Sequence, residues 1–130
     1  MTFGESIKTC LINKYADFDG RASRSEFWWY YLFSSILGWC VGFIYGLSLG
    51  LNLVLGLSLG VEQLLVLNWI VSIGLFLPGL AVGVRRLHDT GRSGWNCFWA
   101  FLPIVGTILL LVWSASKSTG DNKYGPVPND

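Results

Sequence analysis

Charged residues are scarce in this chain of 130 residues. Asp, Glu, Lys and Arg make up 13% of it and apolar residues 52%, whereas a typical soluble domain is about 25% charged. This balance excludes intrinsic disorder, which requires low hydrophobicity and high charge, and it argues against a soluble globule. Because the net charge is only +1, no basic field attracts nucleic acid, and we expect no nucleic-acid partner.

Three long segments contain no Asp, Glu, Lys or Arg: Phe27–Val61, Gln63–Val84 and Ser93–Ser116. A helix needs about 20 apolar residues to cross the hydrocarbon core of a bilayer. The sequence therefore predicts an all-α membrane protein that forms a single integral-membrane domain. Its three transmembrane helices are expected at about residues 27–49, 64–84 and 95–113, with a polar tail at 114–130.

One stretch of the first segment has an unusual period. Leu occupies every odd position from Leu47 to Leu59, and such alternation is typical of a strand in a soluble protein. A lone strand in lipid would leave its backbone unpaired. We therefore expect the helix to continue past Gly46 and then to loosen into a glycine-rich connection toward Glu62.

A short amphipathic helix is expected before the first span. Thr2 and Glu5 have the spacing of a capping box, and Phe3, Ile7 and Leu11 follow at helical spacing. The pattern fits an interfacial helix on the membrane surface or a helix packed against the spans, and both alternatives stay open. The first apolar run follows 26 more polar residues and has full span length, so we expect no cleavable signal peptide.

Lysine and arginine positions predict the orientation in the membrane. Residues 1–26 and the loop at 85–94 carry seven of them, the loop between the first two spans none, and the tail two. The positive-inside rule therefore places the N-terminus and the 85–94 loop in the cytoplasm. With three spans the tail would lie outside, although it carries Lys117 and Lys123.

Two groups of glycines indicate close helix packing, because small residues let helix backbones approach in lipid. The first group recurs every four residues: Gly38, Gly42, Gly46 and Gly50. Gly79 and Gly83 repeat this spacing in the second predicted span. The partner helix belongs either to this chain or to a second copy, as in a glycine zipper. Pro78 and Pro103 are expected to kink their helices.

The most polar stretches are expected to meet at the cytoplasmic headgroup level, where they bring together five arginines: Arg21, Arg24, Arg85, Arg86 and Arg92. Three interpretations compete. In an anchor, arginines splayed outward contact lipid phosphates while Asp19, Glu26 and Asp89 pair with them. The arginines could instead form a specific site for an anionic phospholipid headgroup. In a catalytic site, His88 would act as a base oriented by a carboxylate at an open cleft.

Motifs of known chemistry are missing. Cys10, Cys40 and Cys97 are far apart and form no CxxC pair, and no serine elbow, phosphate loop or metal-ligand spacing occurs. The predicted spans hold no ionisable Asp, Glu, Lys, Arg or His, which weighs against an active transporter. We therefore expect no enzymatic activity, no metal and no cofactor.

Four motifs together cover nearly the whole chain: KYADFDGRASRSEFWWYYLF (14–33), RRLHDTGRSGW (85–95), FLPIVG (101–106) and GDNKYGPVP (120–128). They resemble the small bacterial inner-membrane family called domain of unknown function 805. The resemblance implies a bacterial inner-membrane protein with a few spans, but no activity, because the function of the family is not established. The matching residues carry over only as motif positions of unknown role: Arg21, Arg24, Glu26, Arg85, Arg86, His88, Asp89, Gly91 and Arg92.

Our main hypothesis is a non-enzymatic scaffold or accessory protein that acts by helix association. Its partners would be the bilayer and either a second copy of the chain or another membrane protein. The alternative is a protein that binds an anionic phospholipid, or a small transport protein, with the five arginines as its headgroup site.

Overall fold

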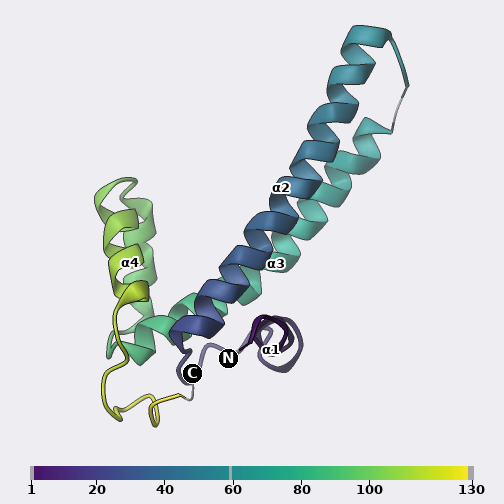
Figure 1. The fold of residues 1–130 in the computed structure, drawn as a ribbon. Helices are drawn as coiled ribbons and strands as arrows, with labels where there is room; N and C mark the ends of the chain where they lie inside the picture. Colours follow the sequence, from purple (N-terminus) through teal and green to yellow (C-terminus); the bar gives the residue numbers. More distant parts are fainter. Residues whose placement is uncertain (1, 59, 129–130) are drawn as a thin grey trace. The chain divides into compact units, whose positions relative to one another are not determined.

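A computed structural model describes residues 2–58 and 60–128 of the chain, and these residues form helices and no β-strand. The predicted all-helical class is confirmed. Figure 1 shows the helical elements in order: α1 (Phe3–Lys8), η1 (Thr9–Asn13, a π-helical turn), α2 (Arg24–Leu55), α3 (Val61–Asp89), η2 (Gly94–Phe101, a 3₁₀ helix) and α4 (Val105–Ala115).

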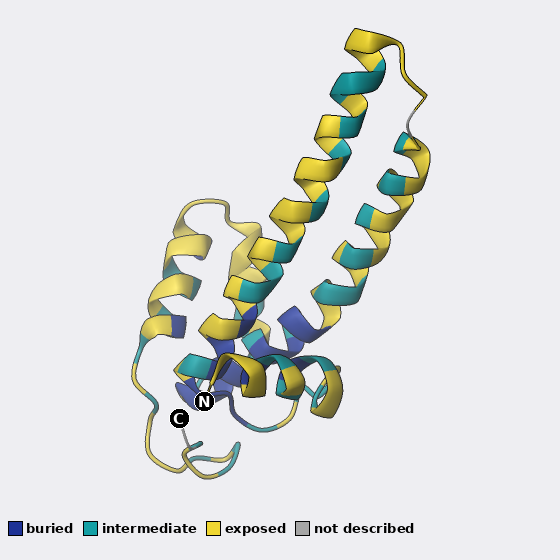
Figure 2. Cartoon of the chain, turned by 45° about the vertical axis from the view of Figure 1, so that its right-hand side comes forward, coloured by how far each residue is buried: buried dark blue, intermediate teal, exposed yellow. Residues whose placement is uncertain are grey.

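The chain divides into two compact units. The charged unit consists of Met1–Tyr31 and Leu77–Asp130, and the apolar unit consists of Leu32–Phe76. All nine lysines and arginines lie in the charged unit. Every buried residue among those described also lies there, whereas the helices of the apolar unit are exposed or half-buried (Figure 2). The charged unit therefore contains the protein core, and the apolar unit offers its side chains to the surroundings.

The first two predicted spans correspond to α2 and α3. Both helices are long and apolar enough to cross a membrane, and in the apolar unit they run side by side (Figures 1 and 2). The leucine series is helical as far as Leu55, which confirms that it is not a strand; Leu59 lies outside the described residues. The helix thus continues further than predicted. Gly56, at φ +64°, follows its last residue in a conformation that favours glycine.

A third continuous transmembrane helix is not confirmed. Residues 95–113 are divided between η2, of 8 residues, and α4, of 11 residues, and neither approaches the length of about 20 that a span needs. Pro103 lies in the break, where its missing amide hydrogen does not have to be paired. Pro78, by contrast, lies inside the uninterrupted α3.

Instead, η2 and α4 pack against each other as a hairpin. At its open end, the Arg92 guanidinium lies 4.6 Å from the centre of the Trp113 ring. At its closed end, the backbone of Gly106 comes so near the Trp99 carbonyl that an added Cβ would collide with it. The hairpin therefore brings the end of α4 back to the C-terminal end of α3.

The N-terminal helix has the predicted capping box. The Glu5 amide donates to the Thr2 hydroxyl, and the Thr2 amide donates to the Glu5 carboxylate. Of the two alternatives for its position, the structure has the helix packed against the start of α2, where the Ser6 hydroxyl donates to the Glu26 carbonyl at 2.6 Å and Cys10 is buried. Contact with the membrane surface stays a prediction.

Gly106→Ala tests the close packing of the hairpin. We expect the new methyl group to push η2 and α4 apart and to lower the free energy of unfolding by about 1–3 kcal/mol. The measurement is thermal unfolding of the purified protein in detergent, followed by tryptophan fluorescence. Gly42→Ala is the matched control, because a Cβ there meets no atom within 4 Å. Equal stability of the two variants would contradict the packing described.

Candidate functional site

Two helix ends bring the charged motif residues together in the charged unit. Glu26 lies in the first turn of α2, and its amide donates to the Ser23 hydroxyl at 3.2 Å. At the other helix, Arg86 lies in the last turn of α3, which ends at Asp89. The helix dipole favours a carboxylate at an N-terminus and a cation at a C-terminus. It therefore supports Glu26 and Arg86 but disfavours Asp89, which needs positive partners.

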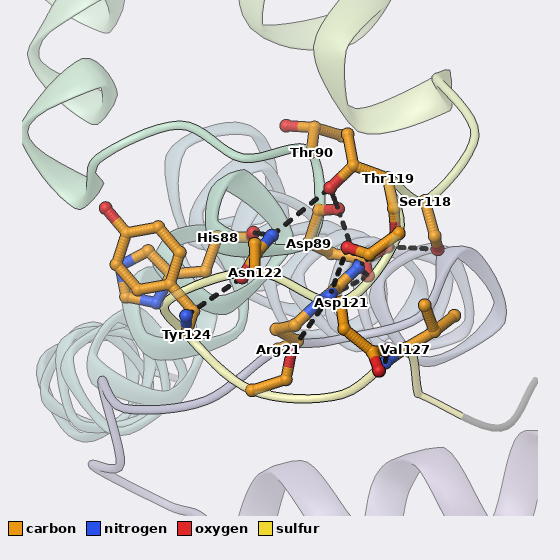
Figure 3. A network of polar contacts seen from close by, with 12 residues as sticks. Arg21, His88, Asp89, Thr90, Ser118, Thr119, Asp121, Asn122, Tyr124 and Val127 are labelled. Carbon is orange, nitrogen blue, oxygen red and sulfur yellow. Dashed lines mark hydrogen bonds and ion pairs between the residues drawn. The ribbon is translucent and has the colours of Figure 1, made fainter.

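The Asp89 carboxylate, which is fully buried, is the centre of this network (Figure 3). Its Oδ1 accepts hydrogen bonds from Arg21 Nη2 at 2.8 Å and from Arg21 Nε at 3.0 Å. Its Oδ2 accepts from Arg86 Nη1 and from the Ser118 hydroxyl. One buried carboxylate is thus paired with two arginines from different parts of the chain.

Arg21 uses its remaining N–H groups to hold the C-terminal tail. Its Nη2 donates to the Thr119 carbonyl at 2.7 Å, and its Nη1 donates to the carbonyls of Gly120 at 3.0 Å and Gly125 at 3.1 Å. The Thr119 amide in turn donates to the Asp89 carbonyl at 3.0 Å. The tail is thus docked within the charged unit, on Arg21 and Asp89 (Figure 3).

Arg86 connects three segments as well. Besides Asp89, it donates to the Ala22 carbonyl at 3.0 Å, to the Ser114 carbonyl at 2.9 Å and to the Ser116 carbonyl. It therefore ties the end of α3 to the entrance of α2 and to the exit of α4.

A second ion pair joins Arg85 to Glu26. Arg85 Nε also donates to the Asp17 carbonyl at 3.1 Å, while its buried Nη2 has no hydrogen-bond partner within residues 2–58 and 60–128. The Cys10 thiol lies 3.8 Å from the Glu26 carboxylate. Burial, assisted by the Glu26 charge, raises the pKa of Cys10 to about 11. The thiol is therefore protonated at neutral pH and is a poor nucleophile.

His88 is held by the backbone and by an aromatic ring. Its Nδ1 lies 2.9 Å from the Gly20 carbonyl, which can only accept, so Nδ1 carries the proton. Its ring stacks on Tyr124 with 3.9 Å between centroids. No carboxylate of the described residues contacts His88, and Asp89 is engaged by arginines. The arrangement expected for a base oriented by a carboxylate is not formed.

The five candidate arginines fall into two groups. Arg21, Arg85 and Arg86 are buried, whereas Arg24 is exposed and Arg92 is half-buried against Trp113. The predicted pairing of arginines with Glu26 and Asp89 is confirmed. The outward splay expected of an anchor does not apply to the three buried side chains, and Asp19 is exposed. Binding of a headgroup stays a prediction.

Three predicted glycines of the charged unit lie in a turn or in a helix contact. Gly91 adopts φ +78°, and its amide donates to the His88 carbonyl in the turn that ends α3. A Cβ at Gly79 would lie 3.4 Å from the Tyr30 ring, so this glycine packs within the chain. Gly83 faces the Tyr31 hydroxyl in a similar way. No group of His, Cys, Asp or Glu in the described part of the chain could hold a metal ion.

Comparison with known proteins decides the family. The profile of the family described as "Protein of unknown function (DUF805)" matches residues 15–126. The chain belongs to the DUF805 family. The resemblance inferred from the four sequence motifs is thereby confirmed.

Relatives of this DUF805 protein are found in Escherichia coli. Inner membrane protein YhaI of strain K12 is 38% identical over 119 residues, which cover 91% of each chain. Inner membrane protein YhaH of that strain is 37% identical over 119 residues, which cover 91% of this chain and 92% of YhaH. The uncharacterized protein YiiR is 38% identical over 94 residues, covering 72% of this chain and 53% of YiiR. No solved structure is significantly similar to the chain.

Asp89→Asn tests whether this DUF805 fold depends on the buried carboxylate. Losing its charge leaves two buried arginines without their counterion, so we expect the free energy of unfolding to fall by about 3–5 kcal/mol. Denaturant titration in detergent measures this change. Asp121→Asn is the matched control, because Asp121 is an exposed residue of the same tail network. An Asp89→Asn protein as stable as the control would show that the cluster does not hold the fold.

Proposed function

We propose that this DUF805 protein is a non-enzymatic inner-membrane protein that acts by helix association, as a scaffold or an accessory subunit. The observation that carries the proposal is the open glycine stripe of α2: Gly38, Gly42, Gly46 and Gly50. A Cβ built at any of the four would meet no atom within 4 Å.

Glycine in the middle of a helix is unfavourable by about 0.5–1 kcal/mol relative to alanine. On a face that nothing covers, four glycines would therefore only weaken α2. They become favourable when another helix packs closely against that face, because small residues let the two backbones approach. Gly79, which Tyr30 covers within the chain, lacks this open face. The difference supports the α2 stripe as a surface for a second copy or for another membrane protein.

The topology that fits best has two spans rather than three. We propose that α2 and α3 cross the membrane and that the η2–α4 hairpin enters the cytoplasmic leaflet and returns. Eight residues of 3₁₀ helix are about 16 Å long, which is roughly half of a 30 Å hydrocarbon core. This topology puts Lys117 and Lys123 in the cytoplasm with the other seven basic residues, in agreement with the positive-inside rule.

The alternative, an anionic-phospholipid site or a small transport protein, has weaker support. Arg21, Arg85 and Arg86 already donate to protein oxygens in the core. A headgroup site would therefore rest on Arg24 and Arg92, whose side chains keep some exposure. Phosphate contacts by these two would fit an anchor as well as a specific site.

Gly42→Leu tests the proposed association. A leucine in the middle of the stripe would keep two helices apart, so chemical crosslinking in membranes should yield far less oligomer than the wild type gives. Cys40→Leu is the matched control, because residue 40 is exposed and lies about 200° around the helix from Gly38. An oligomer that survives Gly42→Leu, or one that Cys40→Leu removes equally well, would contradict the stripe as its interface.

A further inference from the structure

A pocket in the charged unit opens beside the stacked rings of His88 and Tyr124. Its volume is about 490 Å³, and its apolar walls come from Phe18, from Leu80 and Val84 of α3, and from Trp95 and Phe98 of η2. Ligand pockets are typically about 300–1,000 Å³, mostly apolar, with a few polar groups that orient the ligand. The size and lining of this pocket are of that kind.

His88 supplies the polar group. It is 92% buried, at 8% relative exposure, and it lines the pocket. Because Nδ1 is committed to the Gly20 carbonyl and one ring face to Tyr124, Nε2 is the nitrogen that can still bind a ligand. It lies beside Gly94, 3.6 Å from where a Cβ would be, and accepts no hydrogen bond from the described residues. The pocket thus contains a nitrogen that can still bind a ligand, on a side chain that is itself more than nine-tenths buried.

The charges around the pocket favour an acidic group. Neither Asp nor Glu lines it, and Lys123 Nζ lies 5.1 Å from the centre of the Tyr124 ring that forms part of its wall. A carboxyl group suits His88 in either protonation state. A carboxylate accepts a hydrogen bond from Nε2 of a charged imidazole, and a carboxylic acid donates one to Nε2 of a neutral imidazole.

We propose that this pocket binds one free fatty acid, with its carboxyl group at His88 Nε2 and its alkyl chain along Leu80, Val84 and Phe98. The exposed side chains of η2 explain how such a ligand enters. Trp95 is 76% and Phe98 51% exposed, so the outer wall of the pocket is continuous with an apolar surface that a lipid chain can follow. This binding site is independent of the association proposed for α2.

The test uses the full-length protein in nanodiscs and palmitic acid that carries a photoreactive diazirine in mid-chain. After irradiation, mass spectrometry should locate the adducts within residues 80–98, and unlabelled palmitate should abolish them. Leu80→Trp fills the pocket and should reduce the adducts about tenfold. Leu77→Trp is the matched control, because it introduces the same side chain on α3 at a residue that does not line the pocket.

A second pair of measurements tests the headgroup. His88→Gln should weaken competition by palmitate about tenfold, whereas competition by methyl palmitate should be weak and the same in both proteins. This variant also serves if Leu80→Trp fails to fold. The proposal is overturned if adducts spread along α2 and α3 without competition, or if methyl palmitate competes as well as palmitate. It is also overturned if lysophosphatidylglycerol competes and palmitate does not, since the ligand would then be a phospholipid.

Discussion

The charge of Asp89 is the constraint on which the rest of the charged unit depends. A buried carboxylate costs several kcal/mol unless charged partners pair with it, and its place at the C-terminal end of α3 adds an unfavourable helix dipole. Arg21 and Arg86 pair with it, and each also binds another segment: Arg21 holds the tail, and Arg86 holds the exit of α4. The two arginines that pair with the Asp89 carboxylate therefore hold the N-terminal segment, the η2–α4 hairpin and the tail around the end of α3.

The distribution of side chains is the reverse of that in a soluble domain. Charged residues such as Arg85 and Asp89 are fully buried, while large apolar ones such as Trp39, Phe43 and Phe76 are exposed. In lipid, apolar side chains gain no hydrophobic free energy by packing together, so hydrogen bonds and the van der Waals contacts of closely approaching backbones hold helices instead. Hydrogen bonds hold the charged unit together, and the open glycines of α2 are suited to close backbone approach.

The sequence predicted those parts of the fold that depend on local pattern. Gaps in charge located α2 and α3, and the spacing of Thr2 and Glu5 located the first helix. The break between η2 and α4 was not predicted, because counting apolar residues measures the length of a segment and not its direction. The chain turns back at Pro103, where Gly106 contacts the Trp99 carbonyl. Pairing of arginine with carboxylate was predicted, but Arg21 and Asp89 are 68 positions apart, and no spacing rule connects them. The place where the tail docks could not be predicted, because Arg21 binds its backbone carbonyls, which every residue has.

The most direct test of this account is the side of the membrane on which residue 123 lies, because Asp89 and Arg21 hold the tail beside the N-terminal segment. Single cysteines would replace Asn13, Ser58 and Lys123 in a protein whose own cysteines are changed to alanine. A membrane-impermeant maleimide would then be added to intact spheroplasts. We expect Ser58→Cys to be labelled from outside, whereas Asn13→Cys and Lys123→Cys should react only after the cells are opened. Labelling of Lys123→Cys in intact spheroplasts, with Asn13→Cys protected, would contradict the shared arginine–carboxylate core and restore three spans.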